Sequence, residues 1–416
     1  MASVPESYHC LGNGHDDTPA IKTQCAPIGP SNTEVTSNEP VVQNGTNQPV
    51  TENSTSSPAR ENSAIKPPTL KVLILGINGF IGHHLTRRIL ETTNWQVYGL
   101  DIDSSRLSAS NNDNDKNNPR LSFHKGDIRH SHPWIESRIR ESDVVIPLAA
   151  IAKPAVYVSH PLSVFELNFE AMLPVIRLTA QYKKRLIFPS TSEVYGMCHD
   201  AEFHPLNSEL VCGPIHKTRW IYSCAKQLID RVIWGYGLEQ GLDFTLFRPF
   251  NWVGTGLDDF RLGKPGSSRV TTQFLGHLVR GEDITLFDGG GQRRAFTDVE
   301  DGVDALMAII RNEGGVASGK IYNMGNPRND VSIRELAERM LALARGNPVL
   351  AGRVEGVRLV SRDTGEFFGE GYQDAMHRVP WIGNTRQELD WRPKVGLDES
   401  LRRIFAGLEE MGESSG

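Results

Sequence analysis

The sequence contains few cysteines and no long apolar run, and these absences exclude several classes of protein. Its 416 residues include five cysteines, without a Cys-x-x-Cys pair or a His/Cys cluster at zinc spacing. We therefore expect reduced thiols, no disulfide framework and no metal site. No apolar run approaches the roughly 20 residues of a membrane-spanning helix, and no signal or import pattern is recognisable at the N-terminus. We expect a cytoplasmic protein.

An excess of positive charge is also absent. The formal net charge is −6, with 23% charged and 38% hydrophobic residues. This balance gives no electrostatic reason to bind nucleic acid or an anionic membrane. The composition is typical of a globular protein, and we expect neither nucleic acid nor membrane as a partner.

Aromatic residues are nearly absent from residues 1–68, which are rich in Ser, Thr, Asn, Pro and Glu. A segment of this kind cannot bury enough apolar surface to offset the entropy that it would lose on ordering. We predict that residues 1–68 form a disordered polar tail.

From residue 71 onward, short apolar runs alternate with helical patterns. The expected strands are 71–75, 96–100, 121–125, 143–148, 185–189 and 244–248. The alternation predicts an α/β fold with a Rossmann-type, doubly wound parallel sheet. We assign 69–250 to an NAD-binding domain, completed by parts of 270–310. Residues 251–412 are assigned mainly to a smaller, mixed α/β substrate domain. An Asn/Asp-rich loop is expected over 103–118, and helices are expected over 220–236, 299–311 and 333–344.

A glycine motif lies between the first expected strand and the first expected helix. Gly76, Gly79 and Gly82 follow the pattern Gly-x-x-Gly-x-x-Gly. In this context they permit a tight turn, the approach of a pyrophosphate to the backbone, and close packing of helix on strand. The helix N-terminus would then bind the phosphates. The predicted cofactor site also includes three residues within or beside the motif: Asn78, Phe80 and Ile81.

Asp101 closes the second expected strand, at about the distance where a carboxylate reaches the ribose hydroxyls of a bound dinucleotide. Such a carboxylate would repel a 2′-phosphate, so the sequence favours NAD over NADP. Asp127 and Ile128 follow the third strand and are well placed to contact the adenine. The alternative for Asp101 is a solvated acid at a strand end.

Tyr222 and Lys226 are four residues apart in the expected helix 220–236 and therefore share one helical face. To act as a base at neutral pH, a phenol must have its pKa lowered by about three units, which takes roughly 4 kcal/mol. A nearby ammonium group and the positive nicotinamide ring would supply this. Tyr-x-x-x-Lys pairs are common by chance. The pair indicates a catalytic site because Thr191 and Ser192 follow strand 185–189, where their hydroxyls can hydrogen-bond the reacting oxygen.

With these motifs in this order, residues 70–410 resemble the extended short-chain dehydrogenase/reductase family. The chain is most similar to the subgroup of NAD-dependent UDP-glucuronic acid decarboxylases, which includes the decarboxylase domain of the bacterial bifunctional polymyxin-resistance enzymes. The resemblance rests on Phe188-Pro-Ser-Thr-Ser-Glu193, Arg219-Trp-Ile-Tyr222-Ser, Phe247-Arg-Pro-Phe-Asn-Trp252 and Gly371-Tyr-Gln-Asp-x-x-His-Arg378. Plant UDP-apiose/UDP-xylose synthases are similar, but there a cysteine usually replaces Ser192. Two departures are a polar tail where the bacterial enzymes carry a formyltransferase domain, and Phe368 where a tyrosine is expected.

The resemblance implies an NAD cofactor, a UDP-sugar substrate such as UDP-glucuronate, and a homodimer. It implies Glu193 as proton acceptor and Arg378 as proton donor. Because an arginine is normally protonated, we interpret Arg378 as the residue that holds the substrate carboxylate and stabilises charge. It also implies substrate contacts from the strand-end hydroxyls Thr191 and Ser192 and from Ala152, Tyr157, Arg219, Asn251, Arg269, Arg294 and Tyr372.

The expected chemistry follows from the substrate. Oxidation at C4 of a hexuronic acid gives a β-keto acid, which loses CO2 readily when the developing enolate is stabilised. The product would be a UDP-4-keto-pentose or, after re-reduction, UDP-xylose. Other hypotheses are a nucleotide-sugar 4-epimerase or 4,6-dehydratase, a UDP-apiose/UDP-xylose synthase, and a non-catalytic NAD-sensing protein. Glu193 and Arg378 also have plain alternatives, as a structural ion pair and a surface-loop arginine.

Overall fold

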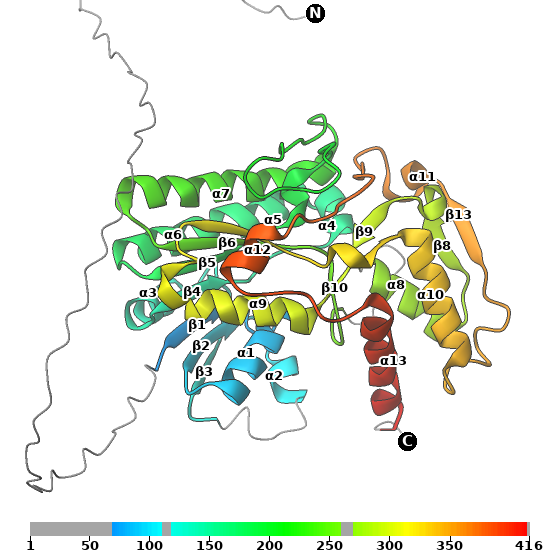
Figure 1. Cartoon of the computed structure of the whole chain (residues 1–416), viewed down its shortest axis with the longest axis horizontal. Coiled ribbons are helices and arrows are strands. Elements are labelled where there is room, and N and C mark those ends of the chain that lie inside the picture. The colour runs from blue at the N-terminus through cyan, green and yellow to red at the C-terminus, as the bar shows by residue number, and fades with distance from the viewer. Residues whose placement is uncertain (1–68, 110–117, 259–268, 414–416) are drawn as a thin grey trace, which may run out of the picture. The chain divides into compact units, whose positions relative to one another are not determined.

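The computed structural model describes residues 69–109, 118–258 and 269–413 (Figure 1). The predicted polar tail 1–68 lies outside the described residues, as do parts of the loops at 110–117 and 259–268. Across the described ranges, every helix is too short or too polar to cross a bilayer.

A parallel sheet of seven strands forms the centre of the compact unit from Lys66 to Gly416, in the order β11-β6-β5-β4-β1-β2-β3. All six neighbouring pairs run parallel, so the predicted Rossmann-type sheet is confirmed. The six predicted strands are present, and a seventh, β11, was not predicted. The strand bounds are β1 Lys71–Leu75, β2 Gln96–Asp101, β3 Leu121–Lys125, β4 Val144–Pro147, β5 Arg185–Pro189, β6 Phe244–Pro249 and β11 Lys320–Met324.

Helices cover both faces of the sheet because alternate strand residues are apolar on both sides. Val72 and Ile74 of β1 pack with α1 and α9, whereas Leu73 and Leu75 pack with α3, α6 and α7 on the opposite face. Figure 1 shows α7 and α6 on one side of the strands and α1 and α9 on the other. The bounds of these helices are α1 Phe80–Thr92, α3 His132–Glu141, α6 Met172–Gln181, α7 Ile221–Gln240 and α9 Val299–Arg311.

The segment predicted as a loop over 103–118 contains a short helix, α2 (Ser105–Ala109), and this part of the prediction was wrong. The side-chain oxygen of Asn78 accepts hydrogen bonds from the backbone N–H groups of Arg106 at 2.9 Å and Leu107 at 3.2 Å. These donors belong to the first turn of the helix, where no partner exists within the helix itself. A cap from the distant glycine motif therefore stabilises a helix of five residues, which is too short to be stable alone.

The C-terminal half forms a mixed α/β layer with three two-stranded pairs: β7 with β10, β8 with β13, and β9 with β12. Apolar residues of α8, α10 and α13 belong to the same hydrophobic cluster as those of α1 and α9. The bounds are β7 Trp252–Val253, α8 Val270–Arg280, β8 Ile284–Phe287, β9 Arg293–Ala295, β10 Thr297–Asp298, β12 Asp330–Ser332, α10 Ile333–Gly346, β13 Leu359–Arg362, α11 Thr364–Phe368, α12 Gly383–Glu388 and α13 Leu397–Glu413. Two further helices, α4 Pro154–Ser159 and α5 Pro161–Phe165, lie before α6.

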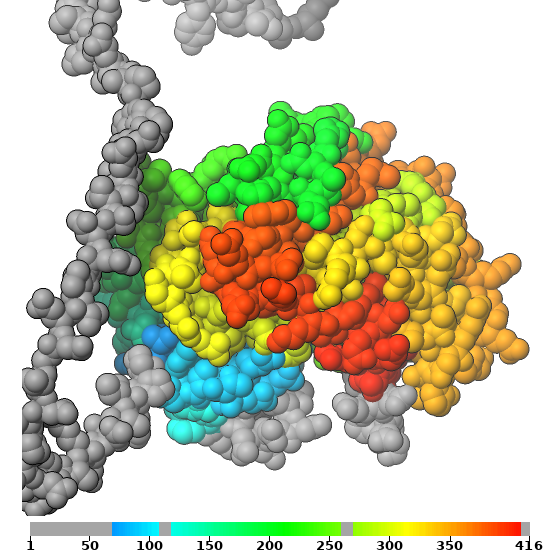
Figure 2. All heavy atoms as spheres, viewed as in Figure 1, coloured from blue at the N-terminus to red at the C-terminus, as the bar shows by residue number. Residues whose placement is uncertain are grey.

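The C-terminal segment is anchored on the nucleotide-binding layer. Trp391 Nε1 donates to the carbonyl of Asp301 in α9 at 2.8 Å, and Lys320 of β11 pairs with Glu388 at 3.0 Å. In Figure 2 the orange and red residues of this segment cover part of the yellow surface. The seventh strand of the sheet, β11, therefore lies outside both 69–250 and 270–310. The division of the chain into domains at residue 250 stays a prediction.

Candidate active site

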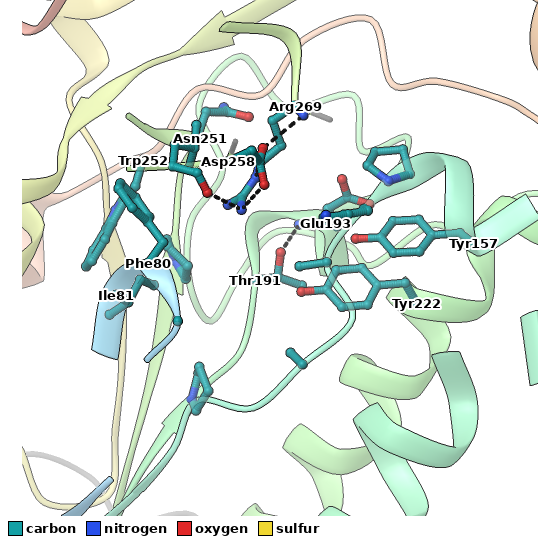
Figure 3. A pocket seen from close by; sticks show the side chains of 18 of the residues that line it. Phe80, Ile81, Tyr157, Thr191, Glu193, Tyr222, Asn251, Trp252, Asp258 and Arg269 are labelled. Atoms are coloured by element: carbon teal, nitrogen blue, oxygen red, sulfur yellow. Dashed lines mark hydrogen bonds and ion pairs between the residues drawn. The ribbon is translucent and has the colours of Figure 1, made fainter. Parts of the chain in front are cut away.

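A pocket of about 910 Å³ lies at the carboxyl ends of the central strands. It includes the place between β1 and β4 where the strand order reverses, which is where open α/β sheets bind their ligands. Every residue predicted for catalysis, for the cofactor or for the substrate lines this pocket. In Figure 3, Tyr157, Thr191, Glu193 and Tyr222 gather on one side, and Phe80 and Trp252 lie across from them. The described part of the chain contains no group of three or more His, Cys, Asp or Glu side chains suited to a metal ion.

The glycine motif forms a cradle that only glycine can build. Gly76 has φ +93°, and a Cβ there would lie 2.6 Å from the backbone nitrogen of Ala149. A Cβ at Gly82 would lie 2.4 Å from the carbonyl oxygen of Gly76. Gly79 is the residue before α1, so the free N–H groups of that helix face the cradle. The residues present therefore fit a dinucleotide pyrophosphate at the N-terminus of α1.

Replacing Gly76 by alanine should abolish NAD binding and lower the melting temperature. The added methyl group would clash with backbone rather than with a movable side chain, at a φ that alanine rarely adopts. Calorimetric titration with NAD and thermal unfolding measure the two effects. Gly235→Ala in α7 is the matched control, because a Cβ there meets nothing within 4 Å. This control should keep NAD affinity and gain up to about 1 kcal/mol in stability. Equal NAD affinity in the two variants would contradict the assignment.

Two carboxylates, those of Asp101 and Asp127, line the same pocket as the glycine motif. The backbone N–H of Asn78 donates to Asp101 at 2.8 Å. Burial raises the pKa of Asp101, whereas hydrogen bonds from backbone N–H groups, including that of Asn78, lower it. Asp127 pairs with Arg129 at 2.6 Å, and the hydrogen bond from that arginine holds the pKa of Asp127 at about 2. Asp101 and Asp127 thus both line the pocket, and their contacts with the ribose and adenine of the cofactor stay predictions.

Tyr222 and Lys226 are both buried on the pocket side of α7. The ring of Tyr222 stacks on that of Tyr157, with centroids 4.7 Å apart and planes at 12°. Burial and the charge of Glu193 raise the pKa of Tyr222, while a hydrogen bond with the hydroxyl of Thr191 opposes the rise. Burial lowers the pKa of Lys226 to about 8, and its Nζ donates to the carbonyl of Pro189 at 2.8 Å. Within the protein itself, therefore, the phenol lacks the lowered pKa that the sequence led us to expect.

Glu193 is clamped between two buried arginines. One carboxylate oxygen accepts from Arg219 Nη1 at 2.6 Å, and the other accepts from Arg378 Nη1 at 3.1 Å. Burial alone would raise the pKa of Glu193, but the two guanidinium charges hold it at about 2. Arg378 is 6% exposed. It is therefore a buried residue of the site, and the surface-loop alternative is wrong.

Asp374 lies in the motif that ends at Arg378, and the sequence predicted no role for it; its carboxylate joins the arginines. Its Oδ1 lies 2.7 Å from Arg294 Nη2, 3.6 Å from Arg378 Nη2 and 3.8 Å from Arg219 Nη2. These three guanidinium groups and the two carboxylates of Glu193 and Asp374 leave one net positive charge in a buried cluster. Two donors, the Nε groups of Arg219 and Arg378, are buried without a hydrogen-bond partner. The cluster is suited to an anionic group on a ligand.

The same pocket is also lined by three further residues predicted to bind the substrate: Asn251, Arg269 and Tyr372. Tyr372 stacks on Phe368 with ring centroids 4.4 Å apart, so Phe368 contributes a flat apolar surface. Asn251 has φ +40° and donates from Nδ2 to the carbonyl of Ala295 at 3.2 Å. Arg269 pairs with Asp258 at 3.0 Å. The structure brings these residues to one pocket, and their roles toward a substrate stay predictions.

A buried polar network beneath the pocket was missed by sequence reasoning. Asp230, one turn after Lys226, accepts from the hydroxyl of Ser190 at 2.6 Å and pairs with Arg248 at 3.3 Å. Arg248 also donates to the hydroxyl of Tyr195 at 2.9 Å. This network fixes the end of β5 directly before Thr191 and Ser192. The only local signal was the i, i+4 spacing of Lys226 and Asp230.

Replacing Glu193 by glutamine should destabilise the fold by about 3–5 kcal/mol at pH 7, because it leaves buried guanidinium charge uncompensated. The pKa of Glu193 is about 2 in the folded protein and about 4.3 when unfolded. Its stabilising effect is therefore complete above about pH 4.3 and is lost as the pH falls toward 2. Urea unfolding from pH 7 to pH 3 should show a shrinking difference between wild type and variant. Glu399→Gln on the surface of α13 should change stability by less than about 1 kcal/mol. A constant difference across this range would contradict the proposed clamp.

The fold and the site define an NAD-dependent enzyme scaffold, and comparison with known proteins agrees. The sequence model of the NAD-dependent epimerase/dehydratase family matches residues 72–325. The chain belongs to this family, and NAD is its cofactor.

Solved structures show the same relationship. PbgP3 from Burkholderia pseudomallei is 55% identical, with a TM-score of 0.74, covering 82% of this chain and 97% of that one. The UDP-glucose 4-epimerase of Thermotoga maritima is 20% identical with a TM-score of 0.64, covering 82% and 99% of the two chains. The dTDP-glucose 4,6-dehydratase DesIV of Streptomyces venezuelae, solved with NAD, is 22% identical with a TM-score of 0.66, covering 82% and 98%. The last two show the shared fold.

Proposed function

We propose that this protein oxidatively decarboxylates UDP-glucuronate, giving a UDP-4-keto-pentose, UDP-xylose or both. The observation that carries the proposal is the buried cluster of Arg219, Arg294 and Arg378, whose charge exceeds that of Glu193 and Asp374 by one. The sugar ring of a neutral UDP-hexose carries no anionic group, whereas that of a hexuronate carries a carboxylate that such a cluster can bind. The resemblance of residues 70–410 to UDP-glucuronic acid decarboxylases supports the same substrate.

The residues around Tyr222 can carry out the first step. The Tyr222 oxygen accepts the proton of the C4 hydroxyl, and the hydroxyls of Thr191 and Ser192 hold the reacting oxygen in place. NAD, when bound, supplies the hydride acceptor and a positive ring that lowers the pKa of the phenol. Lys226, with a pKa of about 8, carries a positive charge at neutral pH one helical turn after Tyr222, where it would favour the phenolate.

The arginine cluster then serves the loss of CO2. The guanidinium group of Arg378 holds the C5 carboxylate and stabilises the negative charge that develops as the C5–carboxylate bond breaks. Glu193, ionised and held by Arg219 and Arg378, fixes the direction of both side chains. A carboxylate with a pKa of about 2 is a weak base. We therefore assign Glu193 a positioning role in the binding of the carboxylate and keep its role as proton acceptor a prediction from resemblance.

Incubation of the full chain with NAD and UDP-glucuronate tests the proposal. We expect release of CO2, with a pentose product identified by mass spectrometry and NMR. These methods separate keto-pentose, xylose and apiose at once. UDP-glucose is the control, and it should give no CO2. Turnover of UDP-glucuronate to its 4-epimer without CO2, or turnover of a neutral hexose, would replace the proposal with an epimerase or a dehydratase. If neither CO2 nor NADH forms under any condition, the proposed function is wrong. Assembly as a homodimer stays a prediction.

A further inference from the structure

Two thiols that the proposed mechanism leaves unused lie against each other at the start of α7. Cys224 is exposed in the first turns of the helix, and Cys212 is half-buried in the segment that precedes it. The two thiols interact, and each shifts the pKa of the other. Cys212 Sγ also accepts from Gln227 Nε2 at 3.3 Å, and Gln227 lies one turn beyond Cys224. The contact with Gln227 therefore places Cys212 over the face of α7 that carries Cys224.

The two thiols differ in reactivity. The interaction with Cys212 lowers the pKa of Cys224 to about 7, although burial acts in the opposite sense. The same contact, together with burial, raises the pKa of Cys212. The thiolate is the form that reacts with oxidants, and an exposed thiol with a pKa near 7 reacts readily. Cys198 differs from both, because it is buried and burial raises its pKa.

We propose that Cys212 and Cys224 form a reversible disulfide on exposure to a peroxide and that this bond lowers the activity of the neighbouring site. The Cys224 thiolate attacks one peroxide oxygen, the O–O bond breaks, and Cys224 becomes a sulfenic acid while hydroxide leaves. The sulfur of Cys212, losing its proton, then displaces the sulfenic oxygen as water, and the S–S bond forms. With hydrogen peroxide, two thiols and one peroxide give one disulfide and two waters.

The bond would reach the active site through a tightly packed segment. Arg219 and Tyr222 lie between the two cysteines in the chain. A Cβ at Gly213 would lie 2.1 Å from Gln373 Oε1 and 2.4 Å from Trp220 Nε1. An S–S bond of about 2.05 Å is shorter than a non-bonded contact between two thiols, so its formation pulls residue 212 toward α7. Because Gln373 and Trp220 pack directly against Gly213, the shift passes to Trp220 and to the adjacent Arg219. Displacements of about 1 Å in a site lower rates by about 10²-fold.

Peptide mapping of the full chain after treatment with hydrogen peroxide tests the bond. Cleavage after Lys217 and Arg219 separates the two cysteines, and cleavage after Glu209 separates Cys212 from Cys198. We expect a pair of peptides joined through Cys212 and Cys224 that dithiothreitol separates. Turnover should fall by about 10²-fold as the link forms and return with dithiothreitol.

Serine variants provide the controls. Cys198→Ser should form the link as the wild type does, whereas Cys212→Ser and Cys224→Ser should not form it and should keep their turnover in peroxide. Only the turnover measurement rests on the proposed function, since the peptide link needs no substrate. The redox proposal is overturned if peroxide leaves these two thiols unlinked, or if the linked protein retains full turnover. A failure of the proposed function shows instead as absent turnover before any peroxide is added.

Discussion

Tyr222→Phe should lower the turnover of UDP-glucuronate by about 10²–10⁴-fold, the range that a general base contributes. The variant loses the oxygen that accepts the C4 proton but keeps a ring that fills the same space against Tyr157. NAD should therefore still bind, and the fold should keep its stability. Steady-state kinetics with UDP-glucuronate, combined with NAD titration, separate loss of chemistry from loss of binding.

Tyr157→Phe is the matched control. Both phenols are buried, they stack on each other at 12°, and in Figure 3 both hydroxyls point toward Thr191 and Glu193. Only Tyr222 stands one helical turn before Lys226 and bonds with Thr191. We expect Tyr157→Phe to raise KM and to retain most of kcat. Similar losses of kcat in both variants would remove the special role of Tyr222. Unchanged behaviour of the Tyr222→Phe variant in the cell would favour a non-catalytic NAD-sensing protein instead.

Arg378→Met should lower CO2 release by about 10²–10³-fold, the loss that follows removal of one preorganised donor to a developing negative charge. The substitution removes the guanidinium group and with it the net positive charge of the cluster, whereas Arg219 still pairs with Glu193 at 2.6 Å. The cradle around Gly76 involves none of these side chains, so NAD affinity should be unchanged. Release of CO2 and NAD titration are the two measurements.

Arg386→Met in α12 is the control for loss of an arginine, because Arg386 is exposed and does not line the pocket. It should release CO2 at the wild-type rate. An epimerase or dehydratase acting on a neutral sugar would keep its turnover in the Arg378→Met variant. Unchanged turnover in this variant would therefore remove the main argument for a carboxylated substrate.

The parts of the fold that the sequence predicted are those with a local pattern. The strand Lys71–Leu75 and the three glycines after it lie next to each other, so their spacing alone indicates a strand, a turn and a helix. β11 was missed because Lys320–Met324 includes a lysine and an asparagine. Asn323 is tolerated in the buried strand because it accepts from the hydroxyl of Tyr195 at 2.7 Å and donates to the carbonyl of Phe203 at 2.6 Å.

The features of the site that escaped prediction depend on residues far apart in the chain. The role of Asp374 becomes apparent only in the fold, where the guanidinium groups of Arg219, Arg294 and Arg378 lie around its carboxylate. Cys212 and Cys224 follow no motif, and only the fold brings their thiols together. The raised pKa of Tyr222 likewise follows from burial and from Glu193, neither of which its position in the sequence reveals. Spacing thus identified the side chains of the site, whereas their electrostatic setting required the tertiary structure.

The late position of β11 has a consequence for how the chain is made. β6 ends at Pro249, but its partner on the outer side begins at Lys320. During synthesis from the N-terminus, β6 therefore presents an open edge of unpaired N–H and C=O groups until Lys320–Met324 leaves the ribosome. Such edges pair readily with other chains. A nascent chain can therefore pair with other chains along β6 in this interval, and a fragment ending near residue 250 would keep this edge exposed.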